Sequence, residues 1–163
     1  MWTAVVVTAL LLQSTVFAQV KLAGAQPELM YLVTVVMAML EGPTTGALAG
    51  FSAGLGQDFL LNQPKGITAL TLTIVGYAVG QVRQYIVTPS PALPVVLVAA
   101  ATFGGILFYG FVSFLLGQLG TGFLFLLRTA LLSAVYNAVL TPLLYPLLKR
   151  LAEASRSQKV YRW

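Results

Sequence analysis

The chain has 163 residues, of which 58% are hydrophobic and only 8% are charged, and its formal net charge is +5. Soluble domains carry about a quarter charged residues, so these few charges cannot cover a water-facing surface, and the composition predicts an integral membrane protein. At roughly 20 residues per crossing, the length suits about six transmembrane helices in one all-α domain. Cysteine and histidine are absent, which excludes disulfides, thiolate chemistry and histidine acid–base catalysis.

The first apolar run covers residues 2–20. Within it, Val16-Phe17-Ala18 resembles the cleavage site of a secretory signal peptide, but no Lys or Arg precedes the run as it would in such a peptide. We therefore expect the first transmembrane helix here, with cleavage as the alternative.

The second helix is expected from Leu29 to Leu40, after Pro27 and Glu28, which both suit a helix start. A helix of that length rises only about 18 Å, against roughly 30 Å of hydrocarbon, so the segment is short, tilted or partly re-entrant. The Gly42-Pro43 step then breaks the pattern before a third helix.

The remaining helices follow in order, separated by turns rich in glycine, proline and amides. Their expected ranges are Thr44–Leu60, Ile67–Ile86, Val95–Leu116 and Thr121–Lys149. Residues 1–149 then form a single transmembrane domain, and residues 150–163 form a basic tail.

The distribution of basic residues predicts the orientation in the membrane. Six crossings put both termini on one side, and that side then carries Arg83, Lys149, Arg150, Arg156, Lys159 and Arg162. Only Lys21, Lys65 and Arg128 lie toward the other side. The positive-inside rule therefore predicts that both termini are cytoplasmic.

A stripe of glycines marks the third helix, which we assign to close helix packing. Lipid offers no hydrophobic drive for helix association, so membrane helices associate where glycine lets two backbones approach. The face comprises Gly42, Gly46, Gly50, Phe51 and Gly54. It either packs against another helix of the chain or docks a separate membrane partner.

Asp58 follows the stripe on nearly the same face of the helix. It is either a helix-end acid at the interface or one half of an ion pair, because charges within membranes usually find partners. Arg128 in the sixth helix is the candidate partner, with Lys65 as the competing cation. In the same sixth helix, the amide of Asn137 is expected to bridge helices, since buried amides need partners.

Other chemistry finds little support in the sequence. The four acidic residues are widely spread, and no phosphate-binding loop or dinucleotide fingerprint is present. We therefore expect no catalytic site, cofactor, metal or nucleic-acid partner. The basic residues Lys149, Arg150, Arg156, Lys159 and Arg162 either bind anionic lipid headgroups or serve as a solvated topology anchor.

Several motifs carry a resemblance to a known family. The spacing of Gly42-Pro43, Gly46, Gly50-Phe51, Gly54-Leu55 and Asp58 resembles the signature GP-x-x-G-x-x-x-GF-x-x-GL-x-x-D of the MreD family of rod shape-determining membrane proteins. Further similar pieces are Pro27-Glu28-Leu29 before it, Gly66 with Ala69-Leu70 after it, and the proline-broken, basic end of the sixth helix from Pro142 to Leu151.

The resemblance implies a function that composition alone does not give. It implies a non-catalytic scaffold of the cell-wall elongation complex in the bacterial cytoplasmic membrane. Such a protein binds MreC and connects MreB, RodA and a class B penicillin-binding protein, in contact with membrane lipids. It also implies a compact bundle similar to the substrate-binding subunits of energy-coupling-factor transporters, so a vitamin-binding transporter subunit is the alternative function.

Overall fold

The computed structural model describes residues 7–9, 11, 15, 28–60, 66–86, 90–117, 120 and 122–160, with side chains to residue 153, and this part of the chain holds helices and turns but no strand. The helices are α2 (Leu29–Glu41), α3 (Pro43–Leu60), α4 (Ile67–Tyr85), α5 (Leu93–Leu115) and α6 (Phe123–Val160). The all-α class is thus confirmed for these residues. Most of the first expected helix, 2–20, and both Lys21 and Lys65 lie outside them.

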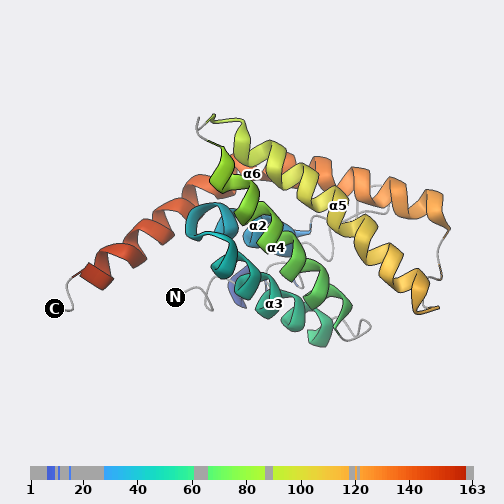
Figure 1. Cartoon of the computed structure of the whole chain (residues 1–163). Coiled ribbons are helices and arrows are strands. Elements are labelled where there is room, and N and C mark those ends of the chain that lie inside the picture. Colours follow the sequence, from blue (N-terminus) through green and yellow to red (C-terminus); the bar gives the residue numbers. More distant parts are fainter. Residues whose placement is uncertain are drawn as a thin grey trace.

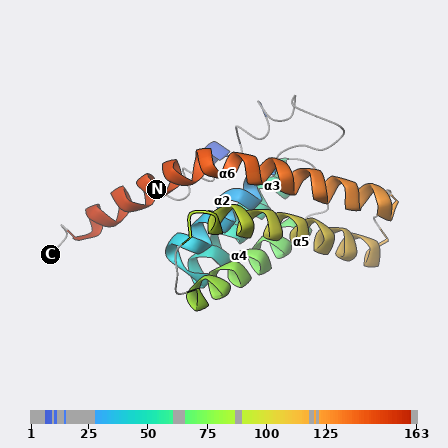
Figure 2. The same ribbon diagram turned by 90° about the horizontal axis from the view of Figure 1, so that it is seen from above.

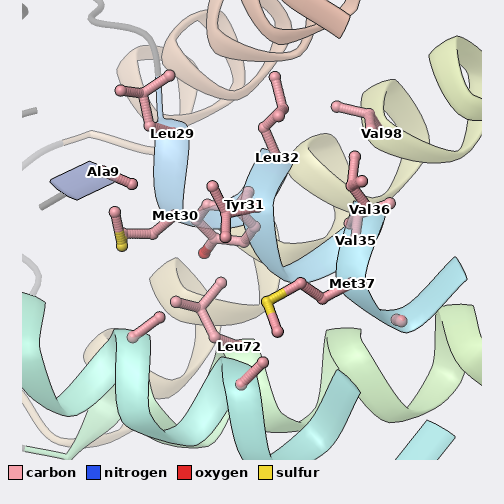
Figure 3. Packing of buried hydrophobic residues seen from close by; sticks show 14 of the residues in the cluster. Ala9, Leu29, Met30, Tyr31, Leu32, Val35, Val36, Met37, Leu72 and Val98 are labelled. Carbon is pink, nitrogen blue, oxygen red and sulfur yellow. The ribbon is translucent and has the colours of Figure 1, made fainter. Parts of the chain in front are cut away.

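Helix α2 is the centre of the bundle. It contacts α3, α4, α5 and α6, and every residue from Leu29 to Ala38 is buried. Its side chains are apolar on nearly all sides, the pattern of a fully enclosed helix. Figure 3 shows these side chains extending to opposite sides, Met37 beside Leu72 of α4 and Val36 beside Val98 of α5, all within one apolar cluster.

The other helices form two pairs around α2. Helices α3 and α4 lie side by side, as do α5 and α6, and α2 runs between the two pairs (Figures 1 and 2). With 13 residues, α2 is only about 20 Å long, less than the roughly 30 Å of hydrocarbon. Because its neighbours enclose it, its ends need not reach either membrane surface.

Among the described residues, two segments are long and apolar enough to cross a membrane, Leu93–Leu115 and Phe123–Glu153. Helices α3 and α4, with 18 and 19 residues, have spanning length but a lower hydropathy. Small and polar residues replace larger apolar ones along these two helices, and Gly46 and Gly76 face each other where the helices meet. The six expected crossings therefore stay a prediction.

The helix bounds match the expected ones closely except in α6. Helix α5 begins before Val95, because Pro94 falls in its first turn, where proline is tolerated. Helix α6 was expected to end at Lys149 but continues to Val160, with Pro142 and Pro146 inside it. The expected tail is thus helical to that point, and this part of α6 projects beyond the other helices (Figures 1 and 2).

Glycines bring the backbones of α3 and α4 together. A Cβ placed on Gly50 would lie well inside 3.0 Å of the Leu72 carbonyl oxygen, and one on Gly76 would meet the Gly46 carbonyl in the same way. Gly54 faces the Ala69 backbone equally closely. The glycine face of α3 is therefore filled by α4 of the same chain, with Thr34 of α2 against both helices.

We predict that Gly50→Ala and Gly76→Ala destabilise the protein by about 1–3 kcal/mol each, since the added methyl group must push two backbones apart. The midpoint of thermal unfolding of the detergent-purified protein measures this loss. Gly104→Ala in α5 is the matched control, because a Cβ there meets nothing within 4 Å, and it should leave the midpoint unchanged or slightly raised. An equal loss in the Gly104 variant would contradict the proposed packing.

Candidate functional site

Polar side chains gather where α2 begins, deep inside the bundle. We call Glu28, Gln57, Asp58, Thr102 and Asn137 the polar cluster. Glu28 immediately precedes α2, Gln57 and Asp58 lie in the last turn of α3, and Thr102 and Asn137 come from α5 and α6. Four of the five are buried, with exposed fractions of 0–5%, and Glu28 is half-buried. Four different segments of the chain thus meet through polar groups.

Asp58 caps the start of α4. Its Oδ2 accepts hydrogen bonds from the backbone N–H of Gly66 at 2.8 Å and of Ala69 at 3.3 Å. Gly66 is the N-cap residue, with φ at 101°, and as a glycine it has no side chain to cap the helix itself. The carboxylate therefore satisfies N–H groups that a helix start leaves without partners, and the positive end of the helix dipole stabilises its charge.

Glu28 joins α3 and α6 to the start of α2. Gln57 Nε2 donates to Glu28 Oε2 at 3.2 Å, and Asn137 Nδ2 donates to the Glu28 backbone carbonyl at 2.9 Å. Asn137 Nδ2 also donates to Thr102 Oγ1 of α5 at 3.0 Å. The expectation that Asn137 bridges helices is therefore confirmed.

The structure does not bring Asp58 and Arg128 together. Among the described side chains, the ion pair within 4.0 Å is Lys149–Glu153. Arg128 is exposed on α6 and forms no ion pair with the Asp58 carboxylate, which is buried. Two backbone N–H groups supply the compensation that was expected from a cation. Lys65, the competing cation, lies outside the described residues.

Two residues assigned to the glycine face differ from the others in their setting. Gly42 is in the turn between α2 and α3, where its φ of 96° favours glycine and where its N–H caps the end of α2 by donating to Ala38. Phe51 is 49% exposed, so its side chain is not enclosed in the packing contact. Gly46, Gly50 and Gly54 form the buried contact, and the backbone of Gly42 also lies against α4, since a Cβ on Gly80 would be 2.9 Å from the Gly42 carbonyl carbon.

The basic residues at the end of α6 are exposed where their side chains are described. Lys149 forms an exposed pair with Glu153 at 3.9 Å, one turn further along, and Arg150 is also exposed. Such surface pairs contribute little to stability. Arg156 and Lys159 belong to the helical backbone of α6, and Arg162 lies outside the described residues.

Sequence reasoning missed several members of the site. Gln57 and Thr102 were not singled out, and Gly66 and Ala69 were recognised only as part of a motif. The available signal was the presence of amide and hydroxyl groups in otherwise apolar helices, where each polar group needs a partner. The described residues hold no group of three or more His, Cys, Asp or Glu side chains suited to a metal ion. What the cluster does chemically is join helices.

The comparison with protein families gives one match over most of the chain. Residues 1–151 match the model of the family described as rod shape-determining protein MreD. Neither a curated protein nor a solved structure matches the chain.

We predict that Asp58→Ala destabilises the protein by about 1–3 kcal/mol, because it leaves two N–H groups at the start of α4 without an acceptor. Arg128→Gln should cost much less, and the charge-exchanged double variant Asp58→Arg/Arg128→Asp should not recover the loss. Thermal unfolding in detergent measures all three proteins. Recovery in the double variant would show that the two side chains form a pair after all.

Proposed function

The chain belongs to the MreD family of rod shape-determining proteins, and we propose that it acts as a non-catalytic membrane scaffold of the cell-wall elongation complex. Family membership over residues 1–151 carries this proposal. It places the protein in the bacterial inner membrane, where we propose six crossings with both termini in the cytoplasm.

The distribution of apolar surface supports a scaffold. In the most apolar windows of α5 and α6 only 28% and 22% of the residues are buried inside the bundle. Large side chains such as Phe111, Phe114, Phe123 and Phe125 are exposed around the turn that joins these helices. In a membrane such surfaces contact either lipid or the helices of other proteins, and the latter is what a scaffold requires.

We propose MreC as the membrane partner. Through it the protein connects MreB, RodA and a class B penicillin-binding protein. The α5–α6 pair is the part of the described bundle best suited to this contact, since the α3–α4 pair already uses its small residues on itself.

Two grooves on the described part of the bundle lack the polar lining that a vitamin-binding subunit requires. One groove lies between α5 and α6, and its lining is wholly apolar, from Ala99 to Ala138. The other lies between α4 and α5, and Thr71 is the only residue of its lining with a polar side chain. A vitamin pocket needs several convergent polar groups, which neither groove offers.

In a rod-shaped bacterium depleted of its own MreD, we predict that the full chain restores rod shape and that MreC co-purifies with it. Gly76→Ala should fail to restore rods at raised temperature, because its bundle is weakened, while Gly104→Ala should restore them. Cell shape by microscopy and immunoblotting for MreC are the two measurements. Round cells despite normal membrane levels of the wild-type chain would refute the proposed role.

We further propose that the basic end of α6 binds anionic lipid headgroups. Lys149 and Arg150 are exposed one turn beyond Pro146, and more basic residues follow along the same helix. Basic groups near an anionic surface contribute about 1 kcal/mol each.

Replacing both Lys149 and Arg150 by Gln should therefore weaken binding of phosphatidylglycerol about thirty-fold, since two such contributions are lost. Titration of the purified protein with this lipid, followed by native mass spectrometry, measures the affinity, and phosphatidylethanolamine serves as the zwitterionic reference. Glu153→Gln, the control at the exposed ion pair, should bind as tightly as wild type or slightly more so. Unchanged affinity in the double variant would leave these residues as a topology anchor only.

A further inference from the structure

Three oxygen atoms in the polar cluster are buried and accept no hydrogen bond from the described residues. They are Asp58 Oδ1, Gln57 Oε1 and Asn137 Oδ1. The three residues are 1%, 5% and 0% exposed, respectively, so bulk water does not reach them. Buried acceptors in folded proteins nearly always have partners, and three together in one cluster call for an explanation.

The other polar atom of each side chain is already engaged. Asp58 Oδ2 accepts from α4, Gln57 Nε2 donates to Glu28, and Asn137 Nδ2 donates to both Glu28 and Thr102. Turning either amide around would place its oxygen against another acceptor and break these bonds. The arrangement therefore fixes all three free oxygens as acceptors.

These oxygens belong to one connected group. Gln57 and Asn137 are both bonded to Glu28, and Asp58 is the next residue after Gln57. This end of α2 thus combines negative charge with an excess of acceptors over donors.

We propose that the polar cluster binds a small monovalent cation such as Na⁺, with Asp58 Oδ1, Gln57 Oε1 and Asn137 Oδ1 as its protein ligands. Carboxylate and amide oxygens are the donors that hard cations prefer, whereas nitrogen and sulfur ligands are lacking. Only one of the three proposed ligands carries a formal charge, and the Glu28 carboxylate of the cluster is already bonded to Gln57, so the site suits a monovalent ion better than Mg²⁺ or Ca²⁺. The start of α4 engages only Oδ2 of Asp58, and a bound cation would give the buried Oδ1 the partner that it lacks.

Thermal unfolding of the detergent-purified full chain tests this proposal, with Na⁺ replacing N-methyl-D-glucamine at constant ionic strength. Ligand linkage predicts a saturable rise in Tm of about 5–10 °C. Gln57→Leu should abolish the rise while leaving the Asp58 cap of α4 in place, and Asp58→Asn should abolish it too. Glu153→Gln, which removes an exposed acid, should keep the rise in full.

Two outcomes would overturn the proposal. Equal Tm values in Na⁺ and in the bulky organic cation would show that no small cation binds. A Na⁺ response that is absent from wild type but present in Lys21→Gln or Lys65→Gln would show that a lysine of the chain neutralises the cluster. Both readouts use the isolated protein, so they do not depend on whether the proposed binding to MreC is correct.

Discussion

The contact between the backbones of α3 and α4 is the constraint on which the rest of the fold depends. Lipid tails are as apolar as leucine, so burying apolar surface does not hold membrane helices together, and close packing must do so. Gly50 and Gly76 supply that closeness because each faces a carbonyl of the opposite helix. A side chain at either position would separate the helices and would also displace Thr34 of α2, whose methyl group lies 3.0 Å from both Cβ positions.

The same contact explains the acid that follows the glycines. Since Gly54 lies against Ala69, the last turn of α3 is held beside the first turn of α4. Asp58 is then within reach of the Gly66 and Ala69 N–H groups, which it binds. Gly54, Asp58, Gly66 and Ala69 come from two parts of the motif and act together. The small residues set the distance between the α3 and α4 backbones, and the Asp58 carboxylate joins the two helices by hydrogen bonds. The charge is tolerated at depth because a helix start provides its partners.

How far the sequence could predict this arrangement depended on the range of each interaction. The bounds of α3 and α4 follow from the glycine, proline and amide residues of the turns beside them, which act locally. The need of Asn137 for a hydrogen-bond partner follows from its polar side chain. The partner of Asp58 was harder to predict, because every residue except proline has a backbone N–H and the sequence does not mark which of them will bind. Arg128 was the candidate partner that the sequence offered. Helix α6 extends past its expected end although Pro142 and Pro146 lie inside it. Prolines one turn apart kink a helix more readily than they end it when the following turns are packed, and Leu148 and Ala152 beyond them are buried.

The position of α2 accounts for the unusual polarity of the interior. A helix of 13 residues that begins inside the bundle turns the carboxylate and carbonyl oxygens of the preceding residue, Glu28, toward protein side chains. Polar side chains from α3, α5 and α6 must then gather around Glu28, and they do so. Because the large apolar side chains of α2 fill the centre, those on the outer faces of α5 and α6 stay exposed. A bundle built in this way is stable through its own contacts and still offers broad apolar surfaces to other membrane helices, which is the physical requirement of a scaffold.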